Sequence, residues 1–494
     1  MAEEGSRMPD GSDRLDEVNK NPPRRGWQPY HHVWLWLFLA WMLLYADRSI
    51  TGPVVNWMIV NDVSFLSQAP MPHALGGIIG SMFFAGYMLT QFPAGFLGDR
   101  YGSKVLILIS VVWSGIATFL SGLTRELYSF VALRIFTGLG EGAYYSNDRA
   151  IVYKLTPEGR RGLGMGVVFV GLAAGLTIAT LLTPPLLDFA SSIWGKDSAW
   201  SFPFLLFSIP TLLIALGIWR FVRIPSAKGA YRKALARLLS YSAIFLVALM
   251  TTYLLTVNFG LGVLFQAVAV LLTALLLIAF IFLRLSSANP KLLRDRDLLV
   301  MYVSAIPLLY TLWFFGFWVL LVVSEASELG LSGAAVYAAL FGVANALGYP
   351  IGGRIYDRLG RTTRRGKRVY SALAFGVALL VFLLAVVITT SKIDVLVLGC
   401  LVFLIGFLFA AAQTVHMTLT ADLSPSGQVA QTFGMWNLVA EVGAVLSPVL
   451  SGALRDLTGD WTLAVLVDGG LLMIGAFMVL LVRNGHPRQH TSAN

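Results

Sequence analysis

Charge is scarce in this chain, and cysteine is almost absent. Charged residues make up 13% of the sequence, hydrophobic residues make up 57%, and the mean hydropathy is +0.73. A water-soluble fold could not bury so much apolar surface. The single cysteine, Cys400, excludes a disulfide framework or a cysteine-based metal site within one chain. The composition therefore predicts an integral membrane protein.

The motifs of several chemistries are missing as well. No G-x-x-x-x-G-K-[ST] phosphate loop and no His-Glu metal motif occurs, so an ATP-driven pump and a metal-dependent membrane enzyme find no support. We expect no catalytic site, no metal and no cofactor. A net charge of +10 would suggest a nucleic-acid partner in a soluble protein. Here the positions of the basic residues indicate membrane topology instead.

Long apolar segments recur along the chain. About 20 apolar helical residues cross a bilayer core. Segments of that length form two groups of six, near 33–56, 75–97, 104–123, 127–153, 162–187 and 201–220, and near 297–323, 331–353, 368–390, 393–415, 424–452 and 460–482. The uncharged segment 238–283 has room for two more. We expect an all-α protein of fourteen spans: bundles 33–220 and 297–482, basic linkers and an inserted pair within 221–296, and tails at 1–32 and 483–494.

The distribution of Lys and Arg supports an even number of spans. With the N-terminus in the cytoplasm, the basic loops lie on the cytoplasmic side, as the positive-inside rule requires. The exceptions on the outside are Arg125, Lys196, Lys392 and Arg455. Twelve or fourteen spans fit this pattern, whereas thirteen would invert the second half. We therefore predict a multi-pass protein of the cell (inner) membrane with both termini in the cytoplasm.

Two repeated patterns indicate duplication. The pattern Leu-[Thr/Ser]-Pro occurs at 155–157 and at 423–425, and a G-x-x-x-D-R-x-G loop occurs once in each half. The loop residues and the lysine that follows the first loop are Gly95, Asp99, Arg100, Gly102, Lys104, Gly353, Asp357 and Arg358. This loop resembles the one between the second and third helices of major facilitator transporters. The resemblance implies that two pseudo-symmetric six-helix bundles enclose a site.

In such a protein the duplicated loops would form a cytoplasmic gate. The glycines would let two helices turn and approach closely, while Asp99 and Arg100 would bridge to helix ends of the opposite bundle. Breaking that bridge would favour an inward-open state. A topology signal alone would explain the arginines but not the Gly-Asp pairing.

Four ionisable residues fall inside predicted spans of the first half. Asp47 and Arg48 interrupt the first span, and Arg134 and Glu141 lie two turns apart on one face of the fourth. Charges within a membrane are costly and are functional candidates by default. The arginines suit an anionic substrate and the acids suit protons. The alternative is that Asp47–Arg48 and Arg134–Glu141 are static pins.

The residues around these charges resemble the anion:cation symporter family, whose galactonate and hexuronate members are proton-coupled importers of sugar acids. The resemblance rests on Tyr45-Ala-Asp-Arg48, Tyr87 and Leu133-Arg-Ile-Phe-Thr-Gly-Leu-Gly-Glu141. It implies that Asp47 and Glu141 couple protons. It also implies that substrate is surrounded by Tyr45, Arg48, Tyr87 and Arg134.

The second half supplies further candidates. Asn437 matches a substrate-contacting asparagine of that family, and Glu441 follows one turn later as a candidate second proton site or a hydrogen-bonded structural acid. Gln413 and His416 share one face of a span. The run that contains Tyr310 and Trp313 matches an aromatic run of the family and is either a wall of the site or ordinary packing.

The chain also departs from the family. Sugar-acid members have a glutamine where this chain has Leu172, which suggests a less hydroxylated substrate, and the inserted pair is not typical. We expect a proton-coupled symporter of a small organic anion in the lipid bilayer, a functional monomer with the inserted pair as a candidate dimer surface. The alternatives are a proton-coupled drug exporter and a spinster-like lipid transporter. A receptor without transport would not need charges in the bundle interior.

Overall fold

The structure is a computed structural model that describes residues 26–157, 160–224, 229–285, 294–360, 362–390, 394–425 and 428–483. The predicted tails lie outside these ranges except for residues 26–32 and 483, as do parts of the linkers around the inserted segment. Every regular element among the described residues is a helix. Thirteen of these elements are long and apolar enough to cross a membrane.

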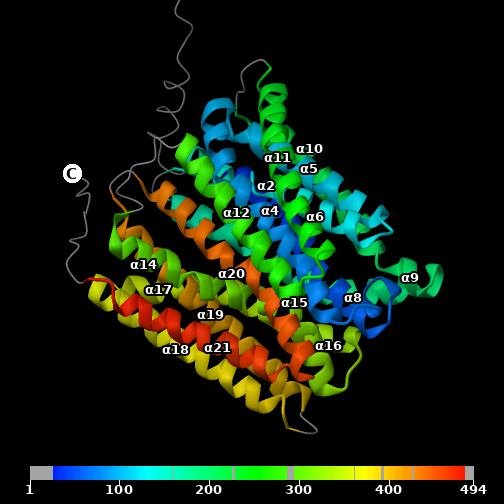
Figure 1. Ribbon diagram of the computed structural model, residues 1–494. Helices are drawn as coiled ribbons and strands as arrows, with labels where there is room; N and C mark the ends of the chain where they lie inside the picture. Colours follow the sequence, from blue (N-terminus) through cyan, green and yellow to red (C-terminus); the bar gives the residue numbers. More distant parts are fainter. Residues whose placement is uncertain are drawn as a thin grey trace, which may run out of the picture.

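The first half folds into one bundle of long helices (Figure 1). Its helices are α2 (Pro29–Val60), α4 (Pro72–Tyr101), α5 (Ser103–Leu123), α6 (Leu127–Glu141), α7 (Tyr145–Leu155), α8 (Arg161–Trp194) and α10 (Phe202–Phe221), with short α3 (Ser64–Ser67) and α9 (Lys196–Ala199). The fourth predicted span is thus two consecutive helices, α6 and α7, each below the length used to identify a span.

The second half builds the other bundle. Its helices are α14 (Arg296–Ser304), α15 (Ile306–Ser327), α16 (Leu331–Ala338), α17 (Leu340–Leu359), α18 (Thr363–Val387), α19 (Val395–Leu423), α20 (Val429–Thr458) and α21 (Thr462–Leu480). Within each half, the most extensive helix contacts are between matching pairs of helices. In the first half α2 packs on α8, α4 on α6 and α5 on α10, and in the second α15 packs on α20, α17 on α19 and α18 on α21. This repetition is the structural counterpart of the duplicated loops.

Glycine determines how closely helices approach. At Gly171 and Gly175 of α8, an added Cβ would overlap the carbonyl oxygens of Phe38 and Met42 in α2. The two glycines therefore bring the backbone of α8 against the helix that carries Asp47 and Arg48. Small residues at such positions are typical of helix packing in membranes.

Between the bundles in sequence lie α11 (Ala230–Asn258) and α12 (Val263–Leu285), which pack on each other. Both also pack on α4 of the first bundle, and α12 packs on α20 of the second. Other faces of the pair present large apolar side chains, including Val247 at 64% and Leu276 at 71% exposure. The pair is therefore apolar on its outer surface and seated beside the seam where α4 meets α20.

In each bundle a lysine side chain binds the C-terminal end of the last helix. Lys104 Nζ, at the start of α5, donates to the carbonyl oxygen of Trp219 near the end of α10 at 3.0 Å. Lys367 Nζ, near the start of α18, donates to the carbonyl oxygens of Leu480 and Val482 at the end of α21. Cations stabilise helix C-termini, where carbonyls lack intrahelical partners. Lys104, predicted as part of a gate, thus caps a neighbouring helix in this structure.

Candidate functional site

A buried ion pair lies at the centre of the first bundle. Arg48 Nη2 and Nε donate to Oε2 of Glu141 at 2.6 and 3.0 Å. The side chains are 3% and 0% exposed. The sequence suggested the static pairs Asp47–Arg48 and Arg134–Glu141. The structure instead pairs Arg48 of α2 with Glu141 of α6.

Aromatic rings surround the guanidinium of Arg48. Its Cζ lies 4.6 Å from the ring centroids of both Tyr45 and Tyr87, 5.5 Å from that of Phe83 and 5.7 Å from that of Trp41. Tyr45 and Arg48 share a face because they are three residues apart on α2. Ring faces stabilise a cation in a dry environment. The three predicted residues Tyr45, Arg48 and Tyr87 are therefore brought together.

Asp47 points to a different neighbour. Its Oδ2 accepts hydrogen bonds from Ser114 Oγ at 2.9 Å and from Thr118 Oγ1, both on α5. Ser114 Oγ also lies 3.0 Å from Oε1 of Glu141. One hydroxyl therefore stands between the two acids that the sequence predicts to couple protons.

Arg134 is fully buried and binds hydroxyl groups only. Its guanidinium donates to Thr51, Ser121 and Thr137 at 3.1 to 3.2 Å. Asp47 and Glu141 are the acids that interact with it electrostatically, without a direct hydrogen bond. Arg134 thus lies behind the Arg48 site and supplies positive charge to it.

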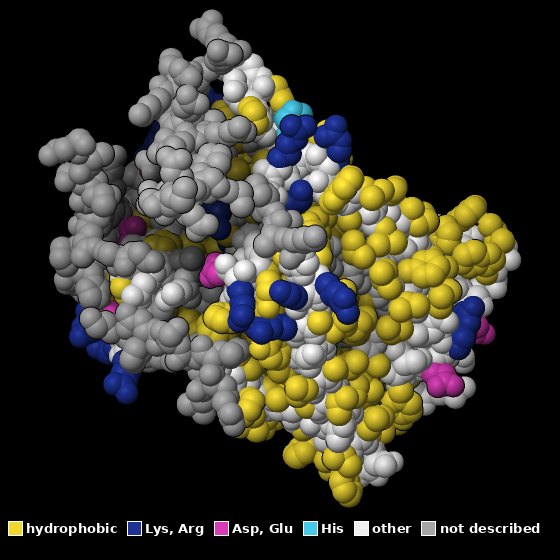
Figure 2. Space-filling view, turned by 90° about the horizontal axis from the view of Figure 1, so that it is seen from above, with side chains coloured by type: hydrophobic (Ala, Val, Ile, Leu, Met, Phe, Trp, Pro, Cys, Tyr) yellow, Lys and Arg dark blue, Asp and Glu magenta, His cyan; other side chains and the backbone are white. Residues whose placement is uncertain are grey.

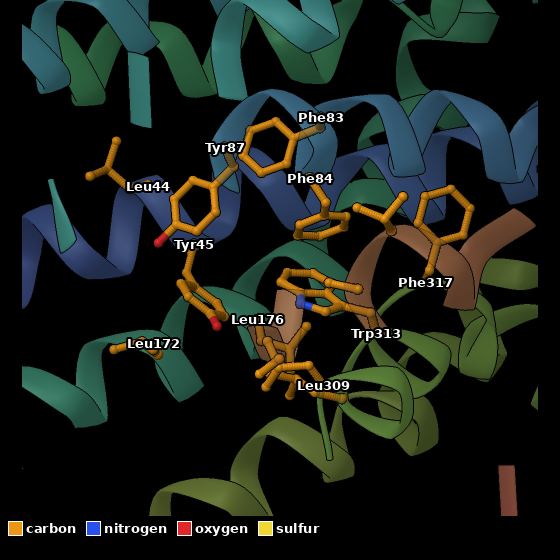
Figure 3. Packing of buried hydrophobic residues seen from close by; sticks show 14 of the residues in the cluster. Leu44, Tyr45, Phe83, Phe84, Tyr87, Leu172, Leu176, Leu309, Trp313 and Phe317 are labelled. Atoms are coloured by element: carbon orange, nitrogen blue, oxygen red, sulfur yellow. The ribbon is translucent and has the colours of Figure 1, made fainter. Parts of the chain in front are cut away.

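The second bundle covers the site with Trp313 of α15. Its ring stacks on Tyr45 at 5.8 Å and tilts against Phe84 of α4 at 4.4 Å between centroids. Figure 3 shows this group, with Leu172 and Leu176 of α8 in the same cluster. Trp313 therefore faces the other bundle, as expected for a wall of the site.

Asn437 and Glu441 of α20 also face the first bundle. Asn437 Nδ2 donates to Oε1 of Gln91 on α4 at 2.9 Å and to Oε1 of Glu441 at 3.2 Å. Glu441 is 3% exposed, and Arg48 is the cation that acts on it most strongly. The interface therefore holds a carboxylate from each bundle within range of one arginine.

Three other predicted substrate residues lie within the second bundle. Tyr310 bonds to Ser451 at 2.9 Å, and Gln413 accepts from Tyr349 at 3.1 Å. His416 is 0% exposed and lies between Ser304 and the indole of Trp436. Because Trp436 donates to Nδ1 of His416, the proton of a neutral ring sits on Nε2. We therefore assign no role in substrate binding to Tyr310, Gln413 and His416.

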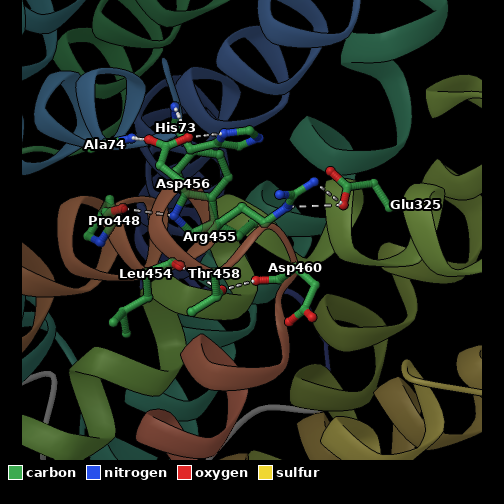
Figure 4. Close-up of polar contacts among 10 residues, drawn as sticks. His73, Ala74, Glu325, Pro448, Leu454, Arg455, Asp456, Thr458 and Asp460 are labelled. Atoms are coloured by element: carbon green, nitrogen blue, oxygen red, sulfur yellow. Dashed lines mark hydrogen bonds and ion pairs between the residues drawn. The ribbon is translucent and has the colours of Figure 1, made fainter. Parts of the chain in front are cut away.

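The bundles are held together at the end of α4 that lies opposite the gate loop. Figure 4 shows Oδ1 and Oδ2 of Asp456 on α20 accepting from the His73 ring and from backbone N–H groups of His73 and Ala74. The ring contact measures 2.6 Å. Nearby, Asn56 Nδ2 donates to the carbonyl oxygen of Phe317 at 3.0 Å. This end of the interface is closed.

The residues of the predicted gate loops lie at the opposite end. The sequence predicts a loop there, but α4 continues to Tyr101 and α17 continues to Leu359, so most of these residues form the last helical turns. Gly102 ends α4 and precedes α5 with φ +100°, a conformation that other residues rarely adopt. Asp99 and Arg100 are exposed, and among the described residues neither forms a hydrogen bond or ion pair with the other bundle. Asp357 and Arg358 are exposed as well. Figure 2 shows Lys and Arg side chains on the face of the molecule that is seen from above. Among the described residues, the predicted bridge from Asp99 and Arg100 to the opposite bundle is therefore not formed.

Three buried acids, Asp148, Asp297 and Asp468, are not identified from the sequence. Asp148 of α7 accepts from the Trp41 indole at 2.6 Å and pairs with Arg149 at 2.6 Å. Asp468 of α21 accepts from Thr311 at 2.6 Å. Asp148-Arg149 lay in a predicted span and could have been found by the intramembrane-charge criterion. In the part of the chain that is described, no group of three or more His, Cys, Asp or Glu side chains could hold a metal ion.

Comparison with known proteins identifies the family. The model of the Major Facilitator Superfamily matches residues 37–324 and 308–494. The chain belongs to the major facilitator superfamily. It is therefore a multi-pass membrane protein of a transporter family.

Relatives within this superfamily carry organic anions. The chain is 26% identical to the probable sulfoacetate transporter SauU of Cupriavidus necator, over 90% of this chain and 91% of that one. It is also 26% identical to the hexuronate transporter of Bacillus subtilis, over 91% of this chain and 93% of the relative. The structure of a D-xylose–proton symporter matches with TM-score 0.64 and 14% identity over 93% of this chain and 99% of that one, which shows a shared fold.

Proposed function

We propose that this major facilitator takes up a small organic anion together with protons by alternating access. The observation that carries the proposal is the Arg48–Glu141 pair, caged by Tyr45 and Tyr87 at the interface of the bundles. It joins an anion-binding cation and a titratable acid in one contact. Sulfonates and uronates, the cargo named for two relatives, are the substrates to test first.

The pair links anion binding to proton binding. An incoming carboxylate or sulfonate competes with Glu141 for the N–H donors of Arg48. Protonation of Glu141 removes the competitor and strengthens anion binding. By linkage, the bound anion favours protonation of Glu141 to the same extent. The anion and the proton therefore load together.

Ser114 and Glu441 extend this site. The Ser114 hydroxyl has one proton to donate, so it bonds to Asp47 or to Glu141 at any moment, and we assign it as the link between these acids. Glu441 lies in the other bundle within range of Arg48. We propose it as the acid that replaces the cargo near Arg48 when the empty carrier returns.

For the membrane arrangement we propose fourteen spans, in which α6 and α7 together form one span and α11 and α12 form an inserted pair. The protein would lie in the inner membrane of the cell. Both termini and both gate loops would face the cytoplasm. The closed end, where Asp456 of α20 accepts from Ala74 at the start of α4, would then be the outer end. In this arrangement the described conformation is closed toward the outside.

Transport in proteoliposomes tests the function. We expect sulfoacetate or glucuronate to accumulate when the external buffer is more acidic than the lumen, and we expect an uncoupler to abolish accumulation. Accumulation that is insensitive to the uncoupler would disprove proton coupling. Anion release driven by inward proton flow would instead identify an exporter, the alternative raised by the sequence.

Glu141→Gln tests the role of the ion pair. Glutamine keeps the shape but cannot carry the proton, so accumulation should fall at least tenfold while counterflow exchange of the anion persists. Glu325→Gln is the matched control, since Glu325 also pairs with an arginine, Arg455, at 3.0 Å but within the second bundle. Loss of exchange together with accumulation would assign Glu141 to structure.

A further inference from the structure

A second arginine–carboxylate pair, partly buried, lies in the same bundle as Arg48 and Glu141. Arg149 Nη1 contacts Oδ1 of Asp148 at 2.6 Å and the carbonyl oxygen of Tyr145 at 3.0 Å. Its Cζ lies over the Tyr145 ring at 3.8 Å and near the Phe169 ring at 4.7 Å. The arrangement repeats that of Arg48, a guanidinium with one carboxylate partner and an aromatic surface.

The two arginines share a neighbour. Trp41 lies 5.7 Å from the guanidinium carbon of Arg48 and 5.7 Å from that of Arg149. The two carbons are therefore at most twice that distance apart. Tyr87, which contacts Arg48, also lies within electrostatic range of Arg149. An anion that dissociates from Arg48 would therefore be close to Arg149, and the reverse also holds.

Three side-chain contacts set the order of the two arginines along the bundle. α2 and α6–α7 run antiparallel, with Arg48 against Glu141, Trp41 against Asp148 and Trp34 against Thr156. Arg149 is thus displaced from Arg48 toward the N-terminal end of α2.

The gate loop lies at the same end. Asn147, two residues before Arg149, donates to the carbonyl oxygen of Ala94 at 3.2 Å, and an added Cβ on Gly98 would overlap its side chain. Both positions are on the last turns of α4, and Gly98 lies within the gate-loop motif Gly95–Gly102. Arg149 therefore lies between Arg48 and the end of the bundle that we propose to face the cytoplasm.

Arg149 is also more accessible than Arg48. Its side chain is 18% exposed, against 3% for Arg48, while Asp148 is 1% exposed. A guanidinium has five N–H donors, so the bonds through Nη1 leave donors for another anion. Asp148 offsets the charge and keeps such binding weak. A transit site must be weak in this way, because an anion has to leave as well as enter.

We propose that Arg149 is a second binding site for the cargo anion, a carboxylate or sulfonate, on its way between Arg48 and the cytoplasm. This proposal rests on the function proposed above. The structural alternative is that Asp148 and Arg149 only fasten α7 to α2 through Trp41.

Vesicles of defined orientation separate these roles. Uptake of sulfoacetate or glucuronate into right-side-out vesicles presents the anion to the outer face, and uptake into inside-out vesicles presents it to the cytoplasmic face. Arg149→Gln should raise the KM about tenfold in inside-out vesicles and leave it unchanged in right-side-out vesicles. Arg149→Lys should keep most of the affinity. Arg160→Gln, which removes a nearby cation bonded to Tyr30, is the control for general loss of charge.

Asp148→Asn should change the KM in the opposite direction to Arg149→Gln. Removing the competing carboxylate should lower the KM at the cytoplasmic face, whereas a structural pin would be damaged by either substitution. The proposal is overturned if both variants raise the KM equally at both faces, or if Arg149→Gln changes neither. If Arg149→Gln does not fold, the KM values of Asp148→Asn and Arg149→Lys at the two faces test the proposal in its place. Failure of the wild-type protein to carry either anion would refute the proposed function instead.

Discussion

At the scale of single residues, the hydroxyl of Ser114 is the contact between two acids. Replacing it by alanine removes the donor that Asp47 and Glu141 share while leaving the Arg48–Glu141 pair in place. We expect Ser114→Ala to lower proton-driven accumulation severalfold and to leave counterflow exchange close to that of the wild type. The measurement is transport in the same proteoliposomes, with and without a proton gradient.

Ser110→Ala is the matched control for this variant. Ser110 lies one turn earlier on the same helix, is equally buried, and donates to the carbonyl oxygen of Gly140 at 2.7 Å. It contacts neither acid. Equal losses in the two variants would show that α5 needs its hydroxyls for packing and would remove Ser114 from the coupling path.

The residues of the candidate site were predictable where charge alone identifies them. Arg48 and Glu141 stand out because a span rarely carries charge. Their pairing was not predictable, because it depends on the register between α2 and α6. The position of α6 depends in turn on its packing against α4, which Gly138 allows to be close. Lys104 was assigned to a gate by its motif, whereas its actual partner, the end of α10, is distant in sequence.

At the scale of helices, the duplicated lysines make a paired prediction. Lys104 and Lys367 are each 9% exposed and donate to carbonyls at a helix end. Hydrogen bonds from a charged donor contribute about 1.5–3 kcal/mol. Lys104→Met and Lys367→Met should each lower the unfolding temperature in detergent by several degrees. A Lys104→Met variant with normal stability but impaired transport would support the gate role expected from the sequence.

Helix packing also sets how tightly the outer end closes. An added Cβ on Gly77 of α4 would overlap the carbonyl oxygen of Pro448 on α20. Gly77→Ala should therefore push the bundles apart at this end and favour the outward-facing state. Gly166→Ala is the matched control, because nothing lies within 4 Å of its added Cβ.

Thiol labelling measures this shift. Ser81, one turn from Gly77 on the same face of α4, is 2% exposed. In a Cys400→Ala background, Ser81→Cys should react with an impermeant maleimide from outside severalfold faster when Gly77→Ala is present. Unchanged labelling would show that this contact does not hold the outer end closed.

At the scale of the whole molecule, the two-bundle architecture followed from the repeats, since matching loops imply matching helix pairs, which the contacts of α2 with α8 and of α15 with α20 show. The placement of α11 and α12 did not follow from the sequence. Their apolar surface suggested only that they meet lipid. Contacts with α4 and α20 decide which seam they cover.

The number of spans determines on which side each terminus lies, and labelling can establish that side. Thirteen helices meet the length and hydropathy criteria, but α6 and α7 together supply one more crossing if they act as a single span. With fourteen crossings the two termini share a side, whereas with thirteen they do not. In right-side-out vesicles of Cys400→Ala variants, a cysteine added at either terminus should resist an impermeant maleimide, while Asp460→Cys in the exposed turn before α21 should react. Labelling of one terminus but not the other would require an odd number of spans, and would place the gate loops of the two halves on opposite sides of the membrane.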